Sequence, residues 1–288
     1  MRLRWQRRVR KHLRRMRGHE QILSVAVGNL ERRGLPLARA LQSLMVDATR
    51  FYSERASAGR LLAVAGGKEA VQILLDLFFE QTAKDDLYTT ALTLESLDDR
   101  RAVPPLVRAL LEDANPHRRH AAARALGWIR RPGRTAALAL AQCLVDTTQP
   151  QPAREEAAES LAYVGTPETI APLISMLRDP DVRIRFWAVF GLGASCQGDV
   201  RAVRALESVL EDGETPPGNW WPVGKEALAM LGYKQWSTDE YRMKLAAETQ
   251  RVLSDPNATA EYRWWARNYD TSCDAEQINA GARVISQD

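Results

Sequence analysis

Residues 179–193 read DPDVRIRFWAVFGLG. The turn Asp179-Pro180-Asp181 opens this stretch, and the residues after it are typical of a helix, with Ala188 four positions before Leu192. Residues four positions apart share one face of a helix, so this pair marks a buried stripe. The small alanine lets a neighbouring helix approach closely. The stretch therefore predicts a tightly packed helix that begins directly after a turn.

The same pattern recurs along the chain. A leucine preceded four positions earlier by a small residue returns at intervals of 31 to 36 residues. Turn signals rich in glycine, proline or aspartate follow each of these helices, and a second amphipathic segment follows most turns. This period predicts an all-α fold, an α-solenoid of about six central helical hairpins plus terminal caps. The six anchor leucines are Leu62, Leu94, Leu126, Leu161, Leu192 and Leu228.

The repeat resembles the HEAT repeat, and more narrowly the bacterial HEAT-like repeats first named for phycobilin lyases. Residues 179–193 match best, and the resemblance covers roughly residues 47–253. It implies the fold and no particular activity, because one fold supports many functions. Such repeats place an arginine seven positions before the anchor, and here these arginines are Arg55, Arg119, Arg154 and Arg185.

We expect three regions: a basic amphipathic segment at 1–19, a single solenoid over 20–270 and a flexible tail at 271–288. Within each hairpin we expect the anchor helix to come first and the second helix to line the inner surface. The mixed charge of that surface suits a protein or peptide. The residues expected on it are Gln72, Asp76, Arg108, Glu112, Ser175, Arg178 and Glu207.

Basic residues are concentrated at the N-terminus. Residues 1–17 hold nine basic side chains and no acidic one, whereas the rest of the chain has 31 basic against 36 acidic residues. A basic amphipathic helix there predicts contact with an anionic membrane or nucleic acid. The alternatives are a helix that caps the solenoid and an organelle transit peptide. The residues expected at an anionic surface are Arg4, Trp5, Arg7, Arg8, Lys11, Arg14 and Arg15.

Tryptophan is concentrated at the other end, where six of eight lie beyond residue 186. Tryptophan and arginine are the residues that most often anchor protein interfaces. Neighbours on a helix point about 100° apart and are not buried equally, so the alternative is that one member of each tandem pair belongs to the core. Trp187 is expected in the core. The residues expected to contact a partner are Trp220, Trp221, Trp264, Trp265, Arg108 and Arg178.

Catalytic and metal signatures are sparse. The sequence has no GxSxG motif and no glycine-rich phosphate loop. His117 and His120 are three positions apart, but Asp113 is the one acid close to them. The HEAT-fold iron hydroxylases use repeated His-Glu pairs, and this chain has one such dipeptide, His19-Glu20. We therefore expect no enzymatic activity, no metal and no cofactor.

Cysteine use and hydropathy bear on location. The three cysteines form no CxxC pair, which is typical of a reducing compartment. No apolar run reaches the roughly 18 residues that a membrane span needs. We therefore expect a cytoplasmic protein without a transmembrane segment, with peripheral membrane attachment as an alternative.

These features favour a non-catalytic scaffold or adaptor that binds another protein. Two alternatives remain from the sequence. One is a bilin-lyase-like protein that binds or attaches a tetrapyrrole, and the other is attachment to a membrane or nucleic acid through residues 1–17. The mildly acidic body argues against a HEAT-like DNA glycosylase, which needs a basic groove.

Overall fold

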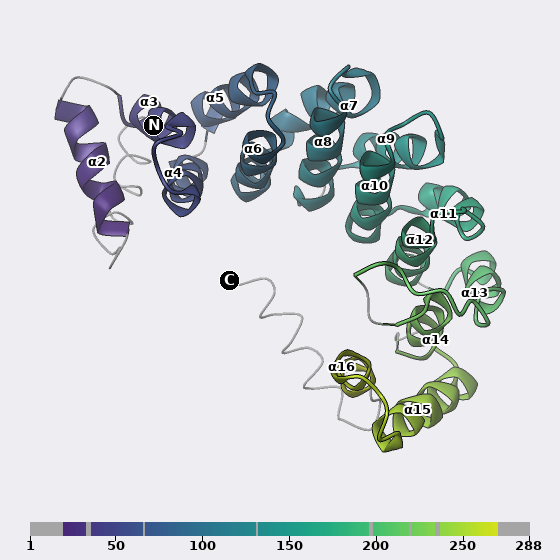
Figure 1. Ribbon diagram of the computed structural model, residues 1–288. Helices are drawn as coiled ribbons and strands as arrows, with labels where there is room; N and C mark the ends of the chain where they lie inside the picture. Colours follow the sequence, from purple (N-terminus) through teal and green to yellow (C-terminus); the bar gives the residue numbers. More distant parts are fainter. Residues whose placement is uncertain are drawn as a thin grey trace. The chain divides into compact units, whose positions relative to one another are not determined.

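The computed structural model describes residues 20–32, 36–65, 67–130, 132–195, 198–218, 221–233 and 237–269, and these ranges contain helices and no strand. The prediction of an all-α solenoid of helical hairpins is therefore confirmed (Figure 1). The chain divides into two compact units, 1–164 and 165–288. A single solenoid over 20–270 stays a prediction.

Unit 1 is built from successive helices joined by short turns. Its helices are α2 (Glu20–Arg32), α3 (Leu37–Val46), α4 (Tyr52–Ala65), α5 (Gly67–Glu80), α6 (Lys84–Leu97), α7 (Val103–Glu112), α8 (Pro116–Trp128), α9 (Arg134–Val145) and α10 (Gln151–Val164), with a 3-10 turn at Arg100–Ala102. The first two of these helices, α2 and α3, precede the hairpin of the first anchor leucine, where the sequence predicts a terminal cap.

Unit 2 follows the same plan. Its helices are α11 (Ile170–Met176), α12 (Val182–Ser195), α13 (Val200–Glu207), α14 (Val223–Tyr233), α15 (Asp239–Ser254) and α16 (Ala260–Asn268), preceded by a 3-10 turn at Pro167–Thr169. The last of these helices, α16, follows the repeats with anchor leucines, where the sequence predicts a terminal cap.

The repeat register is confirmed by burial. All six anchor leucines are at most 9% exposed, and the small residue four positions before each of them is also buried. The order of helices within the hairpin differs from our expectation. Helix α3 pairs with α4, α7 with α8 and α9 with α10, whereas α8 and α9 barely touch. The anchor helix is therefore the second helix of its hairpin.

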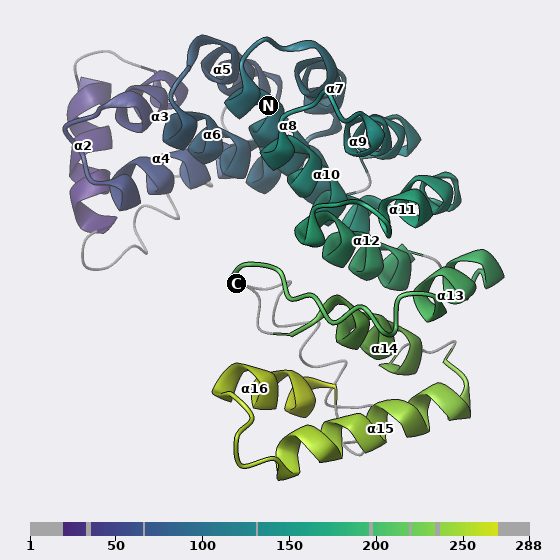
Figure 2. The same cartoon turned by 45° about the vertical axis from the view of Figure 1, so that its right-hand side comes forward.

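Unit 1 has two layers of helices (Figures 1 and 2). Helices α4, α6, α8 and α10 pack side by side and form what we call the inner layer, on the concave side of the unit, while α3, α5, α7 and α9 form the outer layer. Small residues bring the inner helices together: a Cβ built at Gly59 of α4 would lie 2.4 Å from Thr93 Oγ1 of α6. Closer packing on one side curves the stack toward it.

This arrangement corrects the expected inner surface. Arg108 lies on α7 in the outer layer, and Arg178 follows α11, which is the first helix of its hairpin. The expectation that the helix carrying Arg108 lines the inner surface was wrong. The sequence pattern had been divided into hairpins with the anchor helix first, whereas the anchor helix comes second. In unit 1 the anchor helices themselves form the inner layer.

The repeated arginines hold the hairpins together. Arg55 Nε donates to Met45 O at 2.8 Å, and Arg154 Nε donates to Leu144 O at 2.9 Å. These bonds satisfy carbonyl groups that the end of a helix leaves unpaired. Arg185 Nη1 donates to Asp179 O at 2.9 Å, in the turn before its own helix α12, so three of the four arginines bind backbone carbonyl groups between helices.

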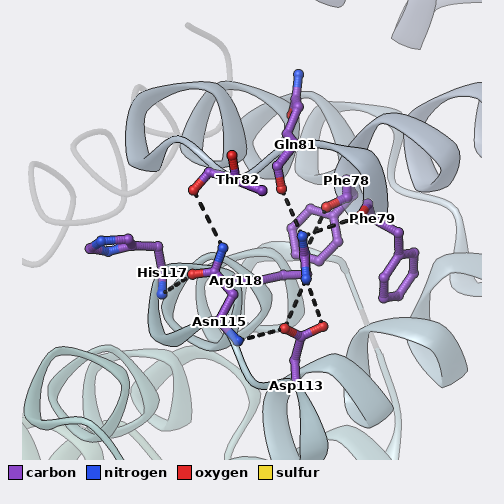
Figure 3. A network of polar contacts seen from close by, with 8 residues as sticks. All are labelled: Phe78, Phe79, Gln81, Thr82, Asp113, Asn115, His117 and Arg118. Atoms are coloured by element: carbon purple, nitrogen blue, oxygen red, sulfur yellow. Dashed lines mark hydrogen bonds and ion pairs between the residues drawn. The ribbon is translucent and has the colours of Figure 1, made fainter.

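Arg118, and not Arg119, has the corresponding role on α8 (Figure 3). Its guanidinium donates to Phe78 O at 3.0 Å, Phe79 O at 3.2 Å and Gln81 O at 2.7 Å, at the end of α5. It also binds both carboxylate oxygens of Asp113, at 2.8 and 2.9 Å. Arg118 thus fixes the start of α8 against the preceding hairpin.

Candidate binding surface

The candidate site lies on α6, α8 and α10 of the inner layer. Charged and aromatic side chains follow one another there at helical intervals, for example His120, Arg124 and Trp128 on α8. Positions i, i+4 and i+8 lie on one face of a helix, so these three side chains point the same way. We call the following eight residues the central cluster: Tyr88, Glu95, His120, Arg124, Trp128, Glu156, Glu159 and Tyr163.

Arg124 lies at the centre of the cluster. Its Nε is 3.8 Å from Glu95 Oε2 on α6, and its Nη1 is 3.7 Å from Glu156 Oε1 and 3.9 Å from Glu159 Oε1 on α10. The guanidinium carbon lies 4.4 Å from the centroid of the Trp128 ring, a cation–π distance. One arginine therefore faces three carboxylates, at distances longer than those of hydrogen bonds.

Glu156 is the most enclosed carboxylate of the cluster, with 9% of its side chain exposed. Its Oε2 lies 3.1 Å from His120 Nε2, but its Oε1 has no hydrogen-bond partner among the described residues. Within the same part of the chain, Glu95 Oε2 and Trp128 Nε1 also lack hydrogen-bond partners. A buried polar atom without a partner costs roughly 1–3 kcal/mol, and a positive charge bound nearby would offset part of that cost for the two carboxylates.

Negative charge is in excess in the cluster. Burial, and then the neighbouring carboxylate of Glu156, raise the pKa of Glu159 to about 7, against the opposing effect of Arg124. Burial also raises the pKa of Glu95. A raised carboxyl pKa means that the surroundings disfavour the ionised form. Arg124 alone does not neutralise three carboxylates, so an additional cation would be stabilised here.

Aromatic rings border these carboxylates. The Trp128 and Tyr163 ring centroids are 4.5 Å apart, and 48% of Tyr163 is exposed. On the other side, Tyr88 packs near His120, with centroids 6.2 Å apart. Carboxylates beside accessible aromatic faces suit positively charged groups, which both features attract.

The predicted tryptophan site in unit 2 is a packed cluster. Trp221 Nε1 donates to Glu226 Oε2 at 2.7 Å, and the Trp221 ring stacks on Trp264 with centroids 6.0 Å apart. Trp264 is 51% exposed, whereas Trp265 is fully buried. A buried side chain offers no surface to a partner, so the assignment of Trp265 as a contact is corrected to a core residue.

The other expectations have mixed outcomes. Trp187 is only partly buried, so its placement in the core was wrong, and Phe186 is the buried neighbour. Arg108 and Arg178 are both exposed but lie outside the central cluster, in different units. Trp220 and the basic residues Arg4, Trp5, Arg7, Arg8, Lys11, Arg14 and Arg15 lie outside the described residues.

The described part of the chain offers little for metal or nucleophilic chemistry. It contains no group of three or more His, Cys, Asp or Glu side chains placed to hold a metal ion. Burial raises the pKa of Cys143 to about 12, so this thiol stays protonated at neutral pH and is a poor nucleophile. None of the described helices is both long and apolar enough to cross a bilayer.

Sequence reasoning missed most of the central cluster. It considered His120 only as a metal ligand and did not single out Arg124, Trp128, Glu156 or Glu159. A signal was present, since Arg124 and Glu159 each lie two positions before an anchor leucine, and Trp128 and Tyr163 lie two positions after it. These positions identify the surface only once the anchor helix is known to face inward.

Comparisons with known proteins agree with the fold. Residues 71–151 and 138–217 match the sequence profile of the HEAT repeats. Human deoxyhypusine hydroxylase, solved with glycerol, is 21% identical over 82% of this chain and 96% of its own, with a TM-score of 0.31. No curated protein sequence is significantly similar to this one.

Two other solved structures have a similar fold. The complex of CpcE and CpcF of phycocyanin lyase from Nostoc sp. PCC7120 is 20% identical over 82% of this chain and 94% of that chain, with a TM-score of 0.47. A designed armadillo repeat protein in complex with the peptide (KR)4 is 18% identical over 70% and 94%, with a TM-score of 0.38. At these levels of identity the similarity concerns the fold alone.

Proposed function

Because the chain belongs to the HEAT-repeat family, we propose that it is a binding protein that holds a segment of another protein against the central cluster. The observation that supports this function most is the position of Arg124 among Glu95, Glu156, Glu159 and Trp128 on three successive inner helices. Helices that are already packed present these groups without a large ordering cost on binding.

The composition of the cluster favours a protein partner. Partly exposed aromatic rings and an arginine are the side chains that most often dominate interface energies. Three carboxylates around one arginine repel phosphate groups, so this surface is unsuited to nucleic acid or anionic lipid. Attachment through residues 1–17 remains a separate proposal. Deleting that segment and measuring binding to anionic liposomes and to DNA tests it, and unchanged binding would refute it.

The exposed Trp264 is proposed as a second contact with the partner. Its ring is held by stacking on Trp221, whose indole is itself fixed by Glu226. A rigid, half-exposed indole loses little conformational entropy on binding. Trp221 and Arg178 are retained as weaker proposals. Arg108 lies on α7 in the outer layer, away from the central cluster, and is not proposed as a contact.

Quantitative affinity capture with matched variants tests the proposed function. The chain is compared with Tyr163→Ala, which removes an exposed ring of the cluster, and with Arg108→Ala, which alters the outer layer of the same unit. Specific partners should be depleted by the first substitution and retained by the second. Equal recovery with all three proteins would contradict the proposed surface, provided that circular dichroism shows the variants to be folded.

A further inference from the structure

We propose that the part of the central cluster between α8 and α10 binds a cationic side chain, a lysine or an arginine, of a partner peptide. This inference rests on the proposed function and specifies the chemistry that the surface recognises. The groups that would make the site are the carboxylates of Glu156 and Glu159 and the rings of Trp128 and Tyr163.

The charges around Glu159 come from two helices. On its own helix α10 it faces Glu155 and Glu156, and from α8 it faces Arg124 and His120. His120 is already engaged with Glu156 at 3.1 Å. Among the described residues, Glu159 has one cation within ion-pair distance, Arg124 at 3.9 Å, and Arg124 is shared with Glu95 and Glu156. A second cation beside Glu159 would therefore reduce repulsion among the carboxylates.

The guanidinium of Arg124 shows how the cluster can bind a cation between an aromatic ring and carboxylates. Arg124 lies 4.4 Å over the Trp128 ring while its nitrogens face carboxylates on both sides. Tyr163, which packs on Trp128 and is 48% exposed, provides a neighbouring ring one helical turn after Glu159. Glu159 and Tyr163 therefore share a face of α10, where a ligand's cation would meet a carboxylate and an aromatic ring together.

The Glu156 carboxylate adds negative charge beneath this surface. Its side chain is 9% exposed, and its Oε1 lies 3.7 Å from Arg124 Nη1. A ligand's cation would therefore be attracted to Glu156 through space, while it contacts the more exposed Glu159 and Tyr163. An anionic ligand group would be repelled by both carboxylates. The geometry thus favours a cationic group over the other groups of a peptide.

Isothermal titration of the full chain with tetra-arginine, at low ionic strength and pH 8, tests this inference. Tetra-citrulline, which has the same shape without the charge, is the control ligand. We expect tetra-arginine to bind and tetra-citrulline not to bind. Glu159→Gln should weaken tetra-arginine binding about tenfold, or about 1.4 kcal/mol. Glu112→Gln, a change of the same charge at an exposed residue of outer helix α7, should alter binding less than about twofold.

Proton release gives a second readout that a merely structural role for Glu159 would not produce. A cation bound beside Glu159 lowers the pKa of this carboxyl, so binding near pH 7 should release a fraction of a proton. Titrations in two buffers of different ionisation enthalpy measure that release. We expect release from the wild type and from Glu112→Gln, and none from Glu159→Gln.

The results separate this inference from the proposed function. The absence of tetra-arginine binding, or equal weakening by Glu159→Gln and Glu112→Gln, would overturn the cation site. If the cation site failed in this way but Tyr163→Ala still depleted a partner in the affinity capture, the proposed function would stand. The surface would then bind that partner through groups other than the carboxylate of Glu159. If Tyr163→Ala also retained every partner, the proposed function would fail as well.

Discussion

Gly127 of α8 is in direct contact with Ser160 of α10. A Cβ built at Gly127 would lie 2.1 Å from Ser160 Oγ and 2.9 Å from Ser160 Cα, closer than real contacts allow. Ser160 Oγ also donates to Ala123 O at 3.0 Å, which joins the two helices. This close approach brings Arg124 of α8 within reach of Glu156 and Glu159 of α10. The geometry of the cluster therefore depends on the small residues at the contact between the two helices.

Gly127→Ala should therefore destabilise unit 1. The added methyl group forces α8 and α10 apart, and such overpacking costs roughly 1–3 kcal/mol, more than the helix propensity gained by alanine. Urea denaturation measures the change. Gly28→Ala is the control, because Gly28 also lies in a helix but a Cβ there meets nothing within 4 Å. Gly28→Ala should leave stability unchanged or increase it slightly. Equal destabilisation by Gly28→Ala and Gly127→Ala would argue against the contact between Gly127 and Ser160.

Glu159→Gln should change how stability depends on pH. Because the pKa of Glu159 is raised from 4.5 to about 7 in the folded protein, the folded state binds this proton more tightly than the unfolded state. The contribution of Glu159 to stability therefore falls as the pH rises from about 4.5 to 7. The variant lacks this loss, so its free energy of unfolding relative to wild type should increase over that window. The raised pKa corresponds to about 3 kcal/mol at full strength, and solvent screening of this partly exposed carboxyl lowers the expected change to on the order of 2 kcal/mol. Denaturation midpoints at pH 5 and pH 8 measure the difference, and a constant difference would contradict the raised pKa.

Leu161→Ala tests the repeat register. Leu161 is an anchor leucine and is fully buried, so its truncation should leave a cavity and cost roughly 2–5 kcal/mol. Leu138→Ala is the matched control, since Leu138 is 38% exposed on α9. The decrease in the free energy of unfolding caused by Leu138→Ala should be well below that caused by Leu161→Ala in the same denaturation experiment. Similar values for the two would mean that the leucine at 161 does not anchor the core.

Arg118→Ala tests the link between α8 and the preceding hairpin. The substitution removes the partner of three carbonyl groups and leaves Asp113 with its charge uncompensated in a largely buried place. Breaking such a pair from one side should cost roughly 3 kcal/mol. Arg101→Ala removes an arginine of a more exposed pair with Asp99, and its effect on stability should be far smaller than that of Arg118→Ala. Thermal unfolding of both variants measures the difference. A much larger loss of stability for Arg118→Ala would support its structural role, and equal losses would contradict it.

The fold was largely predictable because it depends on local spacing. The interval between anchor leucines and the small residue before each of them gave the helices, the buried stripe and the terminal helix α16. The hairpin order was not predictable in the same way. An anchor helix contacts helices on both sides in a repeated sequence, so periodicity alone does not say with which neighbour it forms a hairpin.

The candidate site was harder to predict for a related reason. Arg124 and Glu159 are 35 residues apart in the sequence and meet only because α8 and α10 pack side by side. The concentration of tryptophans beyond residue 186 predicted a contact site in unit 2, where Trp265 is a core residue. It gave no indication of Trp128, which lies under the guanidinium of Arg124 in unit 1. Residue type alone did not distinguish a tryptophan that packs from one that borders a charged surface.

The most direct measurement of the central claim is photo-crosslinking from a defined position. A benzophenone amino acid is placed at Tyr163 in the central cluster, or at Arg108 in the outer layer, and the full chain is irradiated in cells. We predict a discrete protein adduct from position 163, suppressed by Glu159→Gln in the same chain, and no such adduct from position 108. Adducts of equal yield from both positions, or an adduct from 108 alone, would contradict the account.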